Sequence, residues 1–113
     1  MSGTGTLGIC VATKSRMEHV LGLTKAAKAA GKEVKVFFTG EGVLLTKDPL
    51  FPELLKVASA GSTAKHFPVS VCEVSFLANG LKDKDATGLK DKDFVTQGRN
   101  AEMVDECERY VVL

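Results

Sequence analysis

The chain has 113 residues, 44% of them hydrophobic and 26% charged, which is enough for one domain with a sizeable core and too few for two. Fifteen basic residues nearly balance 14 acidic ones, so no excess of positive charge indicates direct binding to nucleic acid or to an anionic membrane. No apolar run approaches the roughly 20 residues of a membrane-spanning helix, and we therefore expect residues 1–113 to form a single domain of a cytoplasmic protein.

The first third of the chain has the pattern of a strand, a helix and a second strand. Residues 6–12 and 33–38 are apolar and β-branched, as is typical of strands in a parallel sheet. Ser15 to Glu18 resembles a capping box, and Gly31 is expected to end the helix. The helix should bury one face, formed by Met17, Val20, Leu21, Thr24 and Ala27. Such a βαβ unit indicates an α/β fold with a right-handed crossover.

A glycine-flanked turn, Gly40-Glu41-Gly42, follows the second predicted strand. The carboxyl ends of the strands are the edge at which open α/β sheets place their binding sites. These three residues, together with Glu73 beside Cys72, are candidates for contacting a substrate or a partner. A tight turn into the next helix explains the two glycines equally well.

Residues 43–60 have a helical pattern that is broken at Asp48-Pro49 and starts again with Pro52 in its first turn. The segment is rich in apolar side chains for so small a domain: Leu44, Leu45, Leu50 and Phe51. This excess suggests a subunit interface, with core packing as the alternative.

Residues 65–71 are expected to form a third strand that leads into Cys72, where a short helical pattern begins. The free N–H groups and the positive dipole end at a helix N-terminus favour a thiolate over a thiol, whereas the carboxylate of Glu73 should oppose this effect. His66 lies roughly 20 Å back along the strand and cannot be a local partner of the thiol. A free cysteine is also commonly a small buried hydrophobic residue, and this is the alternative for Cys72.

The last third contains a repeated hexapeptide, at residues 80–85 and 88–93. Its aspartates resemble the start of a calcium loop, but Phe94 stands where a bidentate glutamate is needed, so we expect a solvated loop. A short strand at residues 94–96, a helix from about Asn100 and a final strand at residues 109–113 should follow. The inward face of that helix is expected to carry Met103, Val104 and Cys107. The result is a mostly parallel five-stranded sheet flanked by helices.

The sequence indicates no metal and no organic cofactor. Cys10, Cys72 and Cys107 are widely spaced, without a C-x-x-C pair for zinc or dithiol chemistry, so no disulfide framework is expected. No phosphate loop, zincin motif or hydrolase elbow occurs. Cys10 should lie in the core, and Cys107 is a weaker redox candidate than Cys72.

Three segments resemble the DsrE/TusD-like family of small sulfur-trafficking proteins: residues 36–43, residues 69–72 with Gly80, and residues 107–112. The resemblance implies a DsrEFH-like α/β fold and a sulfurtransferase-type role in which Cys72 carries sulfane sulfur as a persulfide between donor and acceptor proteins. It also implies assembly, as a homotrimer or homohexamer or as a heteromer with paralogues. The alternative is a non-catalytic oligomeric subunit or small-ligand-binding module in which Cys72 is structural.

Overall fold

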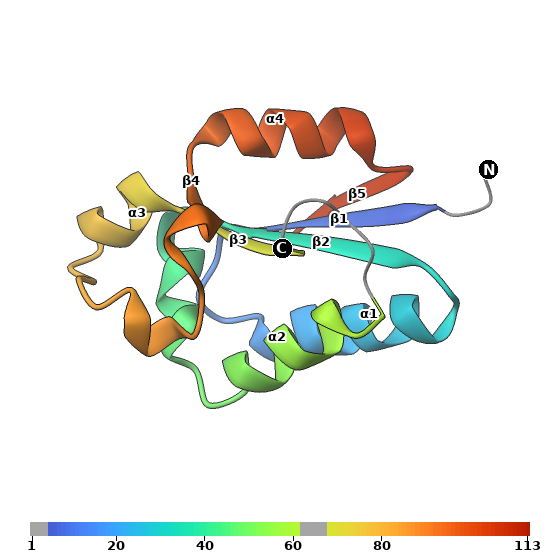
Figure 1. Ribbon diagram of the computed structural model, residues 1–113, viewed down its shortest axis with the longest axis horizontal. Helices are drawn as coiled ribbons and strands as arrows, with labels where there is room; N and C mark the ends of the chain where they lie inside the picture. Colours follow the sequence, from blue (N-terminus) through green and yellow to red (C-terminus); the bar gives the residue numbers. More distant parts are fainter. Residues whose placement is uncertain (1–4, 62–67) are drawn as a thin grey trace.

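The computed structural model describes residues 5–61 and 68–113. Its centre is a five-stranded sheet in the order β4-β3-β2-β1-β5, in which all neighbouring strands are parallel (Figure 1). The strands are β1 (Thr6–Val11), β2 (Glu33–Phe38), β3 (Val69–Cys72), β4 (Phe94–Val95) and β5 (Arg109–Val112). The predicted α/β fold with a five-stranded parallel sheet is confirmed.

Helices cover the two faces of the sheet unequally. The α-helices are α1 (Met17–Ala29), α2 (Phe51–Ser59), α3 (Glu73–Ala78) and α4 (Gln97–Glu106), and the 3-10 helices are η2 (Gly40–Lys47), η3 (Asp85–Thr87) and η4 (Asp91–Asp93). Figure 1 shows α1 and α2 on one face, α4 on the other, and α3 beyond the carboxyl ends of the strands. No helix in residues 5–61 or 68–113 is long and apolar enough to cross a bilayer.

Alternating side chains along the strands supply two separate apolar clusters. Ile9, Val36, Phe38 and Val71 point toward α1 and α2 and form the larger core with the inward faces of those helices. Their neighbours in sequence face α4, where the smaller cluster consists of Cys10, Phe37, Cys72 and Met103. The face of the sheet under α4 therefore holds Cys10 and Cys72.

Helix α1 buries the five residues expected from its periodicity, but the predicted capping box is wrong. Arg16 is the N-cap residue, with φ −120° and ψ 26°, and it makes no side-chain cap hydrogen bond. Ser15 lies one residue outside the helix and so cannot cap it. The break at Asp48-Pro49 is confirmed, since η2 ends at Lys47 and α2 starts at Phe51.

Helix α4 starts earlier than expected, because the Thr96 hydroxyl accepts the Gly98 N–H at 3.2 Å and caps a helix that begins at Gln97. Val104 was predicted to face inward, but its side chain is 54% exposed. Arg99 and Met103, four residues apart, form the buried face instead. Val104 lies a further 100° around the helix axis.

Two other expectations concern the middle of the chain. Strand β3 begins at Val69 and includes Cys72, while residues 65–67 of the predicted strand, with His66, lie outside the described residues. Leu45 and Phe51 are buried, and Leu44 and Leu50 pack partly against the core. Core packing thus accounts for the apolar excess of this segment. The large hydrophobic side chains exposed in the described part are Val74, Leu77, Val104 and Val112.

Candidate functional site

Cys72 is the last residue of β3 and the N-cap of α3. Its extended backbone, with φ −69° and ψ 114°, ends the strand, and the helix starts at the next residue. The side chain belongs to the cluster beneath α4 with Phe37 and Met103, and the residue is only 3% exposed. The predicted strand-to-helix junction is confirmed, and it places the thiol at the carboxyl edge of the sheet.

Three polar residues from separate segments surround the sulfur: Ser75 on α3, Thr39 after β2, and Gln97 at the start of α4. The Gln97 amide donates to the Thr39 hydroxyl oxygen at 2.7 Å, and that oxygen lies 3.4 Å from the Ser75 hydroxyl oxygen. Since Gln97 has two N–H donors and each hydroxyl has one, donors remain for the sulfur. The parallel topology brings all three residues to the same edge of the sheet.

The Gly40 turn holds the Ser75 hydroxyl in place. The Gly40 N–H donates to the Ser75 hydroxyl oxygen at 3.0 Å. The Asn79 side-chain amide donates to the Gly40 carbonyl at 3.2 Å and to the Ser75 carbonyl at 2.8 Å. The turn after β2 is therefore joined to the first turn and to the C-cap of α3, the short helix that follows Cys72.

These donors determine the acidity of the thiol. Burial raises the pKa of Cys72, but the Ser75 hydroxyl and N–H, followed by Gln97 and Thr39, more than offset this effect and lower the pKa below its ordinary value. Donors to the charged form favour the thiolate, which is the nucleophilic form of cysteine. A buried thiol with a lowered pKa differs from a cysteine that only fills space.

Glu73 does not oppose the thiolate as an isolated charge, because its carboxylate forms an ion pair with Lys84. The Lys84 ammonium also lies 5.0 Å from the centre of the Phe94 ring. Hydrogen bonding to Glu73 raises the pKa of Lys84. Glu73 therefore ties the loop after α3 to the first turn of that helix.

The three residues of the glycine-flanked turn have different surroundings. Gly40 has φ +53° and contacts α3 through its backbone, whereas the Glu41 side chain is exposed. A Cβ atom at Gly42 would lie 2.1 Å from the Val11 carbonyl oxygen, so a side chain there would collide with the main chain of β1. Gly42 thus allows η2 to pack against the end of β1, and its role is structural.

The other two cysteines lie in or against the same apolar cluster as Cys72. Cys10 is buried beside Tyr110, and burial together with the Cys10 thiol raises the pKa of Tyr110 to about 12. Cys107 is the C-cap of α4 and is partly exposed, but burial raises its pKa. The most exposed cysteine is therefore not the most acidic.

The arrangement suits chemistry at a thiol. Within the described ranges no three His, Cys, Asp or Glu side chains are grouped to bind a metal ion. Sequence reasoning found Cys72 and the Gly40 turn but missed Thr39, Ser75 and Gln97. Ser75 could have been found, because the third helical residue after an N-cap is the usual N–H partner of the cap.

A model of the DsrE/DsrF-like family matches residues 7–113, essentially the whole chain. No curated protein matches the chain significantly.

Proposed function

Because the chain belongs to the DsrE/DsrF-like family, we propose that it is a sulfur-relay protein in which Cys72 carries sulfane sulfur as a persulfide. The observation that carries this proposal is the set of donors from Ser75, Gln97 and Thr39, which lower the pKa of the Cys72 thiol. A relay requires a thiolate fraction at neutral pH, and this geometry favours one.

The transfer step is an exchange at sulfur. The Cys72 thiolate attacks the terminal sulfur of a donor persulfide, so that a bond forms between the Cys72 sulfur and the sulfane sulfur. The sulfur–sulfur bond of the donor breaks, its electron pair leaves with the donor thiolate, and the proton stays on the transferred sulfur. No net oxidation occurs. An acceptor thiolate then takes the sulfane sulfur by the same exchange, which regenerates the Cys72 thiolate.

Access to the sulfur involves Gln97. Cys72 is nearly inaccessible, while the Gln97 side chain is exposed and hydrogen-bonds to the Thr39 hydroxyl. Rotation of one exposed amide side chain is a fast, local motion. In the proposed relay, this rotation opens the way for the donor sulfur to reach Cys72.

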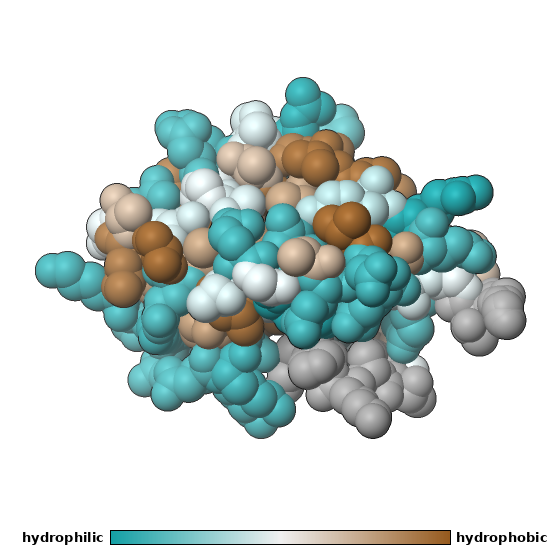
Figure 2. Space-filling view, turned by 90° about the horizontal axis from the view of Figure 1, so that it is seen from above, coloured by the Kyte–Doolittle hydropathy of each residue, from teal (hydrophilic) through white to brown (hydrophobic). Residues whose placement is uncertain are grey.

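We also propose that the protein acts as an oligomer, a homotrimer or homohexamer or a heteromer with paralogues, in the cytoplasm. Val74 and Leu77 are 72% and 54% exposed and lie three residues apart on α3, directly after Cys72. Figure 2 shows apolar atoms at the α3 end of the face that carries α4. A neighbouring subunit or a donor or acceptor protein that covers this patch would sit beside the thiol. The three free cysteines suit a reducing compartment.

One observation favours a second function, that of a subunit in which Cys72 only packs. The residue is 3% exposed and contacts Phe37 and Met103 in an apolar cluster. The rate of iodoacetamide alkylation in the native state separates the two roles. A packing cysteine would react only when the protein unfolds, whereas a thiolate that becomes accessible through the proposed rotation of Gln97 would react from the folded state.

The direct test is sulfur loading. The purified protein is incubated with polysulfide, and peptide mapping locates any mass increment of one sulfur atom. We expect loading on Cys72, its loss in Cys72→Ser, and its retention in Cys107→Ser, the matched control from the same face of the sheet. Loading that persists in Cys72→Ser, or a folded wild-type protein that never loads Cys72, would exclude the relay.

A further inference from the structure

A second candidate site lies between η2 and the loop that follows α3. A cavity of about 440 Å³ opens between η2 and the loop after α3, and its lining includes Phe76 and Gly80. This volume is in the range of small-molecule sites. The persulfide proposal does not use it.

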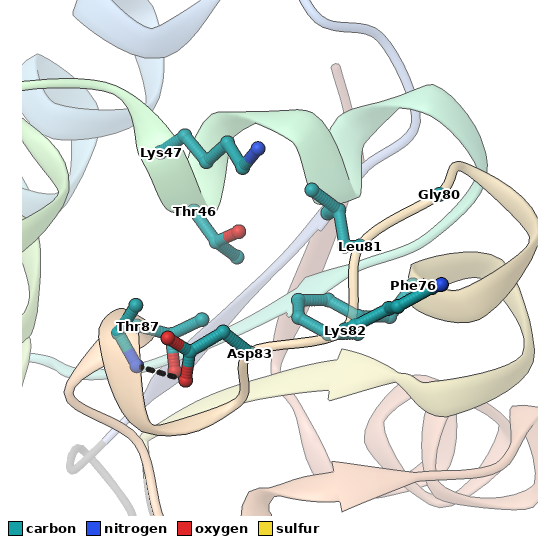
Figure 3. Close-up of a pocket in the computed structure, with 9 residues that line it drawn as sticks. Thr46, Lys47, Phe76, Gly80, Leu81, Lys82, Asp83 and Thr87 are labelled. Carbon is teal, nitrogen blue, oxygen red and sulfur yellow. Dashed lines mark hydrogen bonds between the residues drawn. The ribbon is translucent and has the colours of Figure 1, made fainter.

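The floor of the cavity is apolar and its walls are held by local hydrogen bonds. Phe76 and Leu81 lie at the base between the two walls in Figure 3, and both are nearly fully buried. On one wall, the Thr46 hydroxyl donates to the Val43 carbonyl at 2.9 Å. On the other, the Thr87 hydroxyl donates to the Lys84 carbonyl at 2.6 Å. Both hydroxyls are thus engaged with the main chain that forms the walls.

The rim carries more positive than negative charge. Figure 3 shows Lys47 on the η2 side and Lys82 on the loop side. Neither ammonium group has an ion-pair partner within residues 5–61 and 68–113. Asp83 is the one carboxylate of the lining, and it accepts the Ala86 N–H at 3.1 Å, which holds it against the loop. An anion would therefore find two cations at the rim and an apolar floor below them.

We propose that this cavity binds a small organic anion with an apolar body. The apolar part lies against Phe76 and Leu81, and the anionic group is placed between Lys47 and Lys82. A ligand without charge keeps only the apolar contact. A cationic ligand of the same size is disfavoured by both lysines.

The test uses three probes of equal chain length: hexanoate, hexan-1-ol and hexylammonium. Each is titrated into the full-length protein while amide proton–nitrogen spectra are recorded. We expect saturable shifts with hexanoate at the amides of Gly80, Lys82, Ala86 and Thr87, weaker binding of hexan-1-ol and the weakest binding of hexylammonium. Equal binding of the three probes, or hexanoate shifts scattered over the surface, would overturn the proposal.

Variants test the two parts of the site. Lys47→Gln/Lys82→Gln should weaken hexanoate binding about threefold to tenfold, as expected for two solvent-accessible ion pairs, and leave hexan-1-ol binding unchanged. The control Lys14→Gln/Lys56→Gln removes the same charge from exposed lysines outside the cavity. An equal loss of hexanoate affinity in both double variants would overturn the proposed contacts of the anionic group with Lys47 and Lys82.

Two further variants test the apolar floor of the cavity and the independence of this cavity from the Cys72 site. Ala86→Phe fills the cavity from an exposed lining position and should abolish hexanoate binding. Retained hexanoate binding in this variant would overturn the assigned site. Cys72→Ser should bind hexanoate as the wild type does, because the thiol is not part of the lining. Loss of binding in Cys72→Ser, in a variant whose spectrum shows the native fold, would also overturn it. The outcome of this test is therefore separate from that of sulfur loading.

Discussion

The Gly40 backbone N–H donates to the Ser75 hydroxyl oxygen at 3.0 Å, across 35 residues of sequence. Because the oxygen accepts this N–H, the hydroxyl hydrogen remains available to another acceptor, and the Ser75 hydroxyl lowers the pKa of the Cys72 thiol. A main-chain group, and not solvent, thus holds this hydroxyl in place. The acidity of the thiol therefore depends on the packing of the turn after β2 against α3.

Ser75→Ala should raise the pKa of Cys72. The Ser75 hydroxyl is the largest of the effects that lower this pKa, because a hydrogen bond donated to the sulfur favours its charged form. The pH dependence of Cys72 alkylation, followed by peptide mapping, measures the change. At neutral pH the variant should react more slowly.

The control for this variant is Ser59→Ala, at the exposed end of α2. It removes an identical hydroxyl at a position away from the sulfur and should leave the alkylation profile unchanged. A Cys72 profile that is the same in Ser75→Ala and in the wild type would show that the hydroxyl does not stabilise the thiolate.

Gly42→Ala should destabilise the fold by about 2–4 kcal/mol, because the new Cβ would lie 2.1 Å from the Val11 carbonyl oxygen and one of the two main-chain segments must move. Gly22→Ala is the matched control. Nothing lies within 4 Å of its Cβ position in the middle of α1, so alanine should stabilise the protein by about 0.5–1 kcal/mol. Urea unfolding followed by circular dichroism measures both changes. Equal effects of the two variants would contradict the packing of η2 against β1.

Glu106→Gln should make the free energy of unfolding less dependent on pH in the acid range. The Lys35 ammonium donates to Glu106 at 2.8 Å, and with the nearby Arg99 it lowers the pKa of Glu106 below its usual value near 4.5. A lowered pKa in the folded state contributes stability above pH 4.5, which is lost as the pH falls through the folded-state pKa.

Since Glu106 is partly solvated, we expect the wild type to be more stable than Glu106→Gln by about 1 kcal/mol at pH 7. The difference should shrink as the pH falls below 4.5. Urea titrations across this range measure it. Glu18→Gln, at an exposed position on α1, is the control and should show no such difference. A difference in stability between the wild type and Glu106→Gln that is the same at every pH would exclude the ion pair as the cause of that difference.

Val74→Glu/Leu77→Glu should reduce the proposed oligomer to a monomer of 12.0 kDa. Both side chains are exposed on α3, so the charges are tolerated in the monomer but are costly in a covered interface. Light scattering at micromolar concentration gives the mass. The control Ala26→Glu/Ala29→Glu adds the same charge to the exposed face of α1. A wild-type protein that is itself monomeric would contradict the assembly.

The strands were predictable because buried parallel strands are nearly continuous runs of apolar and β-branched residues. Residues 33–38 were predicted to the residue, and Cys72 was correctly placed at a junction. Helix α4 was placed about three residues too late because the apolar pattern around Met103 was followed and the cap at Thr96 was overlooked. The prediction that Val104 faces the core is wrong because Val104, next to Met103 in sequence, points about 100° away from the buried face.

The surroundings of Cys72 were only partly visible in the sequence. Thr39 and Gln97 are 33 residues before and 25 residues after the cysteine in the chain, and neither belongs to a recognisable motif with it. Thr39 and Gln97 lie close to Cys72 because the carboxyl ends of parallel strands lie at the same edge of the sheet. The strand order, which no local pattern contains, is therefore the information that was missing.

The chain enters α4 from one edge strand, β4, and leaves it for the opposite edge strand, β5. Within residues 5–61 and 68–113, strand β5 pairs only with β1, so the pairing of the C-terminal segment depends on the first strand of the sheet. Contacts between segments so far apart in sequence form slowly, because the entropy of loop closure opposes them. Gln97, at the start of α4, can reach Cys72 only when this helix has packed on the sheet. A chain in which α4 is not packed thus lacks one of the donors that lower the pKa of the thiol.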